Sequence, residues 1–297
     1  MLTLLCFGYG YVAKALATRL LSANAQWRII GTRRPGADSG ASGEPQGVRL
    51  VPFDATTPLH DDVLRRATHI VSSIPPDDDG DVVLRLHGAD MARRAHTVSW
   101  LGYLSATSVY GDAKGKTVTE ETPTAPVSET GRRRAAAETE WLGLAEQTEA
   151  PVGVFRLGGI YGPGRNALAR LIAGKTAFRI TKPGHVLNRI HVDDIVETLL
   201  AAMAKPRSGD VYNVVDNAPA SAADVIAYAA ELLGRPAPPA VPFEKAELSP
   251  AGRRFFEENK HVDNGRIKQA LGVVLAYPTY REGLNALYKA GAAEKEY

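Results

Sequence analysis

The first thirteen residues, Met1–Ala13, read MLTLLCFGYGYVA. The apolar run Leu2–Phe7 predicts a buried strand, and a helical spacing of apolar residues begins directly after it, at residue 12. Residues 8–13 between them form a Gly-x-Gly-x-x-Ala turn, which in dinucleotide-binding folds lets a pyrophosphate approach the start of a helix. The competing interpretation is a glycine turn before a buried helix. The predicted cofactor contacts in this stretch are Gly8, Gly10, Tyr11 and Val12.

A second short apolar run, Trp27–Gly31, is followed by Thr32, Arg33 and Arg34. Arg33 lies about 20 residues beyond the turn, where an NAD site places an acidic residue on the ribose 2′-hydroxyl. Two guanidinium groups there would instead bind a 2′-phosphate. We therefore expect these three residues to contact the cofactor and NADP to be preferred over NAD. The alternative is a solvated loop edge, because residues 35–47 read as a linker rich in Gly, Ser and Pro.

Two further strands are predicted, at Val48–Phe53 and Thr68–Ile74. Asp54 follows the first of them, where it could hydrogen-bond an adenine or cap the next helix. The second strand ends at a proline pair, and its carboxyl edge is expected to line the cofactor crevice. The predicted contacts at that edge are Ser73, Ile74 and Pro75.

Strands and helices alternate along the rest of the first half of the chain. We expect helices at 82–95, 192–204, 222–233 and 280–290, and strands at 97–105 and 151–157. This order predicts an α/β fold, a Rossmann-type doubly wound parallel sheet with a smaller C-terminal substrate lobe. The predicted dinucleotide-binding domain is 1–165 with parts of 185–215, and the predicted lobe is 166–184 with 216–297.

The composition limits the classes of partner. A net charge of +2 gives no electrostatic argument for nucleic acid or a membrane surface. No apolar run approaches the roughly 20 residues that span a bilayer. The single cysteine, Cys6, excludes an internal disulfide, and we expect a cytoplasmic protein. The acidic run 77–81 is expected to start a helix, and no metal site is predicted.

Several motifs occur in an order that resembles the extended short-chain dehydrogenase/reductase superfamily, the NAD(P)-dependent epimerases and dehydratases. The resemblance runs from residue 1 to about 215. It implies binding of NADP or NAD and a small-molecule substrate, such as a nucleotide-linked sugar; a homodimer is left open. The motifs are the glycine turn at 8–13, YLSATSVYGD at 103–112, RLGGIYGPGR at 156–165 and RIHVDDI at 189–195.

The chain departs from the catalytic pattern that the resemblance implies. In that family a Ser or Thr acts with a Tyr-x-x-x-Lys pair, in which the tyrosine is the general acid/base. Here the aligned positions hold Ala106, flanked by Ser105 and Thr107, and the pair is replaced by Thr130 and Arg134. A threonine hydroxyl is too weak an acid for the tyrosine's role, and an arginine cannot serve as a base.

Two functions follow from these residues. The first is an NAD(P)-binding oxidoreductase or epimerase with atypical or weakened chemistry, in which Ser105 and Thr107 orient the substrate and Arg134 anchors the cofactor. The second is an NADP-binding sensor or regulatory protein without redox turnover. His191 is a further candidate base, against a helix-capping or packing role.

Overall fold

The structure of the chain is a computed structural model that describes residues 2–23, 26–36 and 45–291. The chain forms two compact units of similar length, and it passes between them several times. The expected boundary at 165 is not where these units divide, and most of the expected linker, 37–44, lies outside the described residues. The first unit is Met1–Ala106, Arg132–Arg156 and Val196–Tyr212, and the second is Thr107–Gly131, Leu157–Ile195 and Asn213–Tyr297.

A seven-stranded sheet, in the order β11-β7-β5-β4-β1-β2-β3, confirms the predicted α/β architecture. The inner strand β1 is buried from its second residue onward, as expected for a parallel strand covered on both faces. It pairs in parallel with β2 and β4. The strands are β1 Leu2–Phe7, β2 Trp27–Arg33, β3 Val48–Pro52, β4 His69–Ser72, β5 Trp100–Ala106, β7 Val152–Leu157 and β11 Asp210–Val214.

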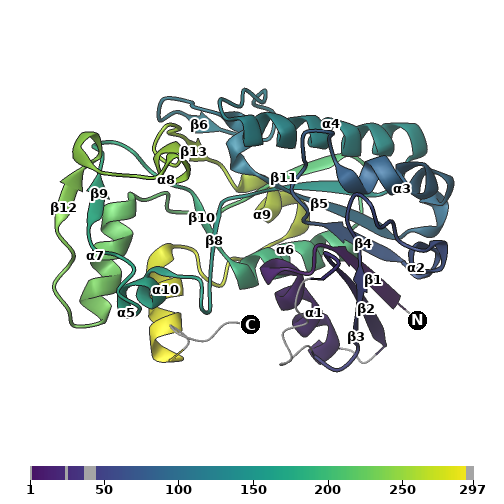
Figure 1. Cartoon of the computed structure of the whole chain (residues 1–297), viewed down its shortest axis with the longest axis horizontal. Helices are drawn as coiled ribbons and strands as arrows, with labels where there is room; N and C mark the ends of the chain where they lie inside the picture. The colour runs from purple at the N-terminus through teal and green to yellow at the C-terminus, as the bar shows by residue number, and fades with distance from the viewer. Residues whose placement is uncertain (1, 24–25, 37–44, 292–297) are drawn as a thin grey trace. The chain divides into compact units, whose positions relative to one another are not determined.

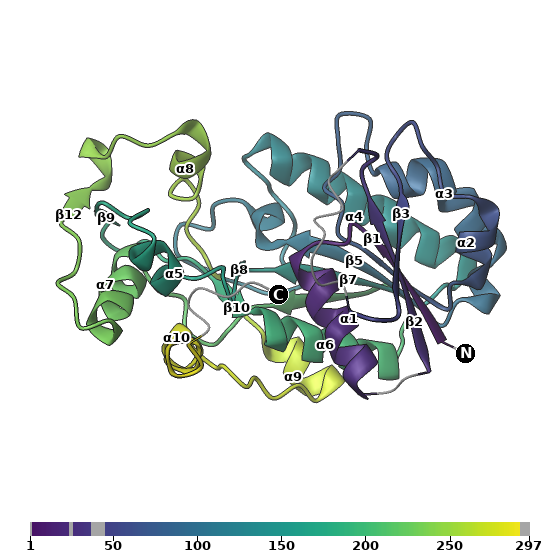
Figure 2. The ribbon, with the colours of Figure 1, turned by 60° about the horizontal axis from the view of Figure 1, so that its bottom comes forward.

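Helices cover both faces of the sheet (Figures 1 and 2). On one face lie α1 and α6, and on the other α2, α3 and α4. Trp141 of α4 stacks on Tyr103 of β5, with 5.6 Å between ring centroids, and donates a hydrogen bond to Asp81. Asp81 also accepts from the amides of Val83 and Leu84, so it caps α3, as the acidic run predicted. The helices are α1 Tyr11–Ala23, α2 Asp61–Arg66, α3 Val82–Arg93, α4 Glu129–Thr148 and α6 Val192–Ala204.

The second unit has its own apolar cluster, shared by α5 (Ala167–Ile172), α7 (Ala222–Leu232) and α10 (Tyr280–Lys289). Ser221 accepts a hydrogen bond from the Asp224 amide and caps α7. Its remaining helices and strands are short; the strands form three parallel pairs that the sequence patterns did not predict. The strand pairs are β8 Gly159–Tyr161 with β10 Arg189–His191, β9 Arg179–Thr181 with β12 Ala240–Pro242, and β6 Thr117–Val118 with β13 His261–Val262. The remaining helices are α8 Pro250–Arg254 and α9 Gly265–Leu271.

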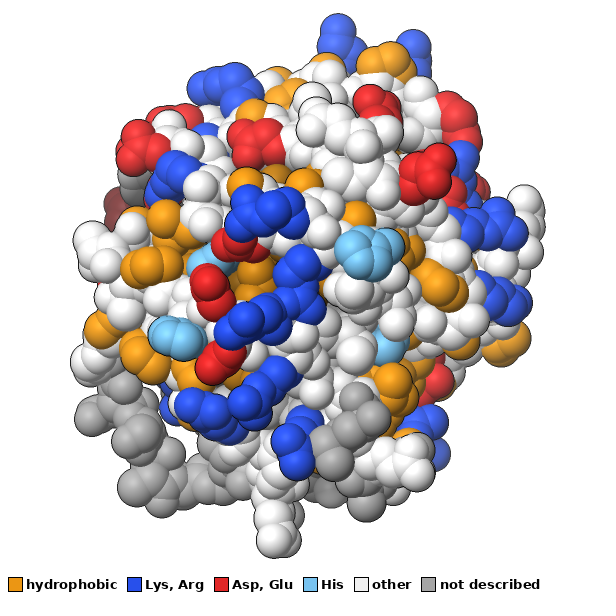
Figure 3. Space-filling view, turned by 90° about the vertical axis from the view of Figure 1, so that its right-hand side faces the viewer, with side chains coloured by type: hydrophobic (Ala, Val, Ile, Leu, Met, Phe, Trp, Pro, Cys, Tyr) orange, Lys and Arg blue, Asp and Glu red, His pale blue; other side chains and the backbone are white. Residues whose placement is uncertain are grey.

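Lysine and arginine side chains gather on the face where α2 and α3 lie, but acidic and histidine side chains are interspersed among them (Figure 3). Each of these two helices holds an ion pair three residues apart, Asp62–Arg65 in α2 and Asp90–Arg93 in α3. Among the described residues, no helix combines the length and the apolar character needed to cross a membrane. Nor does the described part of the chain bring together three metal-ligating side chains.

Candidate functional site

The glycine turn joins β1 to α1 and has the shape of a phosphate-binding cradle. Gly8 has a φ of +84°, and a methyl group there would lie 2.8 Å from the Ser73 hydroxyl. At Gly10 a methyl group would meet no protein atom within 4 Å. The second glycine therefore borders open space directly before the first turn of α1, where helix amides favour an anion. These residues fit the pyrophosphate of a dinucleotide.

Thr32 and Arg33 are the last two residues of β2, beside this turn. Thr32 is buried, and its hydroxyl oxygen accepts a hydrogen bond of 2.9 Å from the Gly8 amide. Arg33 is half-buried, and Arg34 is exposed just beyond the strand. The basic residues thus stand at the strand end next to the glycine turn, while the Thr32 hydroxyl is engaged within the protein.

Asp54 follows β3, and the structure corrects its expected capping role. Its Oδ1 atom accepts hydrogen bonds of 2.9 Å from both the amide and the hydroxyl of Thr56. Those bonds hold the pKa of Asp54 below its usual value. Helix α2 begins only at Asp61, and its cap is His60. The helix starts too far along the chain for Asp54 to reach its first amides, so the capping prediction was wrong and the adenine contact stays a prediction.

Ser73, Ile74 and Pro75 follow β4 at the carboxyl edge of the sheet. Ser73 is half-buried, and its hydroxyl donates to the carbonyl oxygen of Gly8 at 2.8 Å. A methyl group on Gly8 would also lie 3.1 Å from the Ile74 side chain. The edge of β4 therefore packs directly on the glycine turn, and the contact of these residues with a cofactor stays a prediction.

Arg134 of α4 is held against β5. Its Nη1 atom donates to the carbonyl oxygen of Leu104 at 2.9 Å. Burial raises the pKa of the neighbouring Tyr103 hydroxyl far above its usual range, and the Arg134 charge opposes that shift. Ser105 is buried two residues further along β5, and its hydroxyl has no hydrogen-bond partner among the residues that the structure describes. Arg134 thus lies beside β5 with one guanidinium nitrogen hydrogen-bonded to the backbone, and its contact with a cofactor stays a prediction.

Thr107 and Thr130 belong to the second unit. Thr107 is half-buried at the start of the 3-10 turn Thr107–Tyr110. Thr130 is exposed in the first turn of α4, and its hydroxyl lies 3.4 Å from that of Ser128. Ser128 itself accepts from the Gly131 amide and so caps the helix. The Thr130 hydroxyl is therefore a solvent-facing group at a helix start.

His191 is buried at the end of β10, directly before α6. Its Nδ1 atom accepts a hydrogen bond of 3.2 Å from the Asp193 amide. Its ring packs against Tyr161 and Tyr277. Burial lowers the pKa of His191 to about 4, against the opposing charge of Asp193. These contacts confirm the helix-capping and packing interpretation.

Asp216 is a buried carboxyl group that the sequence patterns did not single out. Burial raises its pKa to about 7, while the Ala218 amide, which donates to Oδ1 at 3.0 Å, and the Arg189 charge oppose the shift. Its Oδ2 atom is buried without a hydrogen-bond partner in the described part of the chain. A carboxyl group that titrates near neutrality is a candidate functional group. A lone Asp after a short strand gives no such signal in the sequence.

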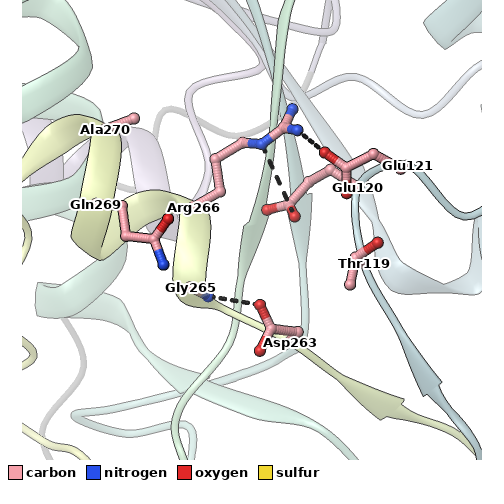
Figure 4. A pocket seen from close by; sticks show the side chains of 8 residues that line it. All are labelled: Thr119, Glu120, Glu121, Asp263, Gly265, Arg266, Gln269 and Ala270. Atoms are coloured by element: carbon pink, nitrogen blue, oxygen red, sulfur yellow. Dashed lines mark hydrogen bonds and ion pairs between the residues drawn. The ribbon is translucent and has the colours of Figure 1, made fainter.

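A polar pocket of about 350 Å³ lies in the second unit (Figure 4). Arg266 reaches across it to Glu120 and Glu121, and Glu120 also accepts from the Asn213 amide at 2.8 Å. None of the predicted site residues lines it. Its lining is Thr119, Glu120, Glu121, Asp263, Gly265, Arg266, Gln269 and Ala270.

Comparison with known proteins agrees with this geometry. Residues 8–215 match the model of the NAD dependent epimerase/dehydratase family, and the chain belongs to that family. "Protein YeeZ" of Escherichia coli K12 is 36% identical over 186 residues, which cover 62% of this chain and 61% of that protein. The match thus spans less than two thirds of this curated relative.

Two solved structures show the same fold over nearly the whole chain. A conserved protein of unknown function from Silicibacter pomeroyi DSS is 46% identical, with a TM-score of 0.88 and coverage of 98% of this chain and 99% of that one. The dTDP-glucose 4,6-dehydratase of Bacillus anthracis, solved with NAD, is 19% identical, with a TM-score of 0.78 and coverage of 97% and 96%. At that identity the second likeness concerns the fold alone.

Proposed function

We propose that this chain is an NADP-preferring oxidoreductase or epimerase that acts on a small or nucleotide-linked sugar with atypical, weakened catalytic residues. The observation that carries the proposal is the cradle at Gly8 and Gly10, open on the side of the second glycine and facing the start of α1. A bound nicotinamide cofactor would supply or accept a hydride. The nucleotide-linked sugar is proposed by analogy with the dTDP-glucose dehydratase.

The NADP preference rests on Arg33, the last residue of β2, and on Arg34 just beyond the strand. A carboxylate is the usual group at this position in NAD sites because it accepts from the ribose 2′-hydroxyl, whereas a guanidinium group pairs with a 2′-phosphate. Arg33 is half-buried at the strand end, so its side chain has fewer orientations to lose on binding than a fully exposed one.

Titration of NADPH and NADH against the wild type and Arg33→Asp tests the preference. We expect the variant to weaken NADPH binding by about 10- to 100-fold, the size of a lost charge-assisted contact, and to leave NADH binding equal or tighter. Arg28→Asp is the matched control, because Arg28 is an exposed arginine near the other end of the same strand. Equal affinities of the wild type for NADPH and NADH would contradict the proposed preference for NADP.

Weak turnover is expected from the groups at the tyrosine and lysine positions. The Thr130 hydroxyl is not acidic enough to exchange a proton near neutrality, and a guanidinium group such as that of Arg134 cannot serve as a base. Arg134 can still hold the cofactor through its charge while Nη1 is anchored on Leu104. We expect Thr130→Tyr to change the rate of NADPH oxidation with an accepted substrate. Ala136→Tyr, at another exposed position of α4, is the control for adding an aromatic ring to this helix.

The second candidate is an NADP-binding sensor without redox turnover, which the exposed threonine at the tyrosine position favours. A panel of carbonyl compounds and nucleotide sugars separates the two. NADPH consumption with any of them supports the enzyme, whereas tight binding without consumption supports the sensor.

Cys6, the only cysteine, is buried and free, which is compatible with the cytoplasm as the proposed location.

A further inference from the structure

Two hydroxyl groups from neighbouring strands hold the Gly8 residue at both of its backbone polar groups. The Gly8 amide donates to the Thr32 hydroxyl at 2.9 Å, and the Gly8 carbonyl accepts from the Ser73 hydroxyl at 2.8 Å. The Thr32 carbonyl also accepts from the Tyr9 amide at 2.9 Å. Thr32 belongs to β2 and Ser73 follows β4, and these two strands flank β1. Hydrogen bonds from residues on both sides of β1 therefore hold the turn in place.

The turn needs these hydrogen bonds because its own glycine residues do little to fix the backbone conformation. Gly8 has a positive φ that few other residues adopt, and glycine has the largest conformational entropy to lose. The Gly10 amide donates to the Gly8 carbonyl at 2.8 Å, so the Gly8 peptide also sets the direction of the chain into α1. A change in the orientation of Gly8 would turn the helix amides away from a bound phosphate.

We infer that Thr32 and Ser73 are positioning residues of the dinucleotide turn, which act through Gly8 rather than by touching the ribose. The inference rests on the proposed function and deepens it. It assigns different tasks to two adjacent residues. Arg33 distinguishes the cofactors by their 2′ group, whereas Thr32 supports the pyrophosphate turn that both cofactors share.

A matched control exists at the opposite end of β1. There the Thr68 hydroxyl accepts from the Thr3 amide at 2.9 Å and donates to the Thr3 carbonyl at 3.1 Å. Thr68→Val therefore removes the same kind of hydroxyl support from the same strand, but far from the glycine turn. A general loss of sheet stability would appear in both variants, and a loss of cofactor binding only in Thr32→Val.

The experiment measures the dissociation constants of NADPH and NADH, by fluorescence titration of the purified full chain. Thr32→Val removes the hydrogen-bond acceptor of the partly buried Gly8 amide, so we expect both constants to rise by about tenfold and by the same factor. Thr32→Ser, which keeps the hydroxyl, should restore wild-type binding, and Thr68→Val should match the wild type. Ser73→Ala should raise both constants by about threefold, because the Gly8 carbonyl keeps the Gly10 amide as a donor.

Several results would overturn the inference. A rise for NADPH alone in Thr32→Val would make Thr32 a contact of the 2′-phosphate. Equal binding by Thr32→Val and the wild type, or equal losses in Thr32→Val and Thr68→Val, would show that the hydroxyl has no role in positioning. Failure of the wild type to bind either cofactor would instead reject the proposed function, and the inference with it.

Discussion

Gly10→Ala should leave the fold intact and remove most of the affinity for a dinucleotide. A methyl group at this position meets no protein atom within 4 Å, and Gly10 is not among the glycines with a positive φ. Alanine therefore fits the backbone, and by restricting the unfolded chain it could stabilise the protein by about 0.4–1 kcal/mol. The open space that receives the methyl group is where a pyrophosphate would approach the backbone.

The loss of affinity follows from the hydrogen bonds that a displaced phosphate cannot form. A hydrogen bond to a charged group contributes about 1.5–3 kcal/mol, so the loss of one weakens binding by about 10- to 100-fold. The expected pattern is a melting temperature that is unchanged or slightly raised, together with a dissociation constant for NADPH raised by that factor. Differential scanning fluorimetry and fluorescence titration on the same preparation measure both.

Gly8→Ala is the contrasting variant, because its cost falls on the fold. The left-handed backbone costs alanine about 1–2 kcal/mol, and the new methyl group would lie 2.8 Å from the Ser73 hydroxyl and 3.1 Å from Ile74. We expect a total loss of about 2–3 kcal/mol, or a melting temperature lower by about 4–10 °C. If Gly10→Ala bound NADPH as the wild type does, or destabilised the protein as Gly8→Ala does, the reasoning from the open cradle would be refuted.

Two further predictions concern buried charges. Burial lowers the His191 pKa from 6.5 to about 4, so as the pH falls His191 binds a proton in the unfolded chain before it does so in the folded protein. The free energy of unfolding should therefore fall by about 3 kcal/mol between pH 6.5 and pH 4. Urea unfolding at a series of pH values should show this loss flattened in His191→Asn but not in His96→Asn, an exposed control; equal profiles would contradict it. Glu138→Ala removes the buried carboxylate that pairs with the Arg156 guanidinium and should cost about 3–5 kcal/mol in the same assay, because both side chains are less than 10% exposed. The control Glu197→Ala breaks an ion pair with a half-exposed partner and should cost under about 1 kcal/mol; similar losses in both variants would contradict the assignment.

Much of the fold follows from local patterns in the chain. The spacing of apolar residues predicted every strand of the sheet except β11, and of the helices that cover it α1, α3 and α6 but not α2 and α4. Helix α6 begins and ends where the pattern placed it, at Val192–Ala204. Asp81 and Ser221 cap helices because a short polar side chain can reach the first free amides without help from distant residues. The division of the chain into two units was not predictable in this way, because it depends on contacts between segments far apart in the sequence.

The glycine turn shows where the sequence is sufficient and where it is not. Its strand, two glycines and helix are neighbours in the chain, so their order alone predicts a cradle for a pyrophosphate. The resemblance of the sequence to the family also predicts that Thr130 and Arg134 stand at the positions of a tyrosine and a lysine, and this stays a prediction. Local steric rules and residue identity decide these properties.

Only the tertiary structure decides what surrounds the turn. Thr32 lies 24 residues from Gly8 along the chain and Ser73 lies 65, and strand pairing brings both hydroxyls to the backbone of this one glycine. Burial likewise raises the pKa of Asp216 and lowers that of His191, although neither residue is unusual in its local sequence. Hydrogen bonds and desolvation act through space, so long-range packing determines which groups support the site and which of them titrate.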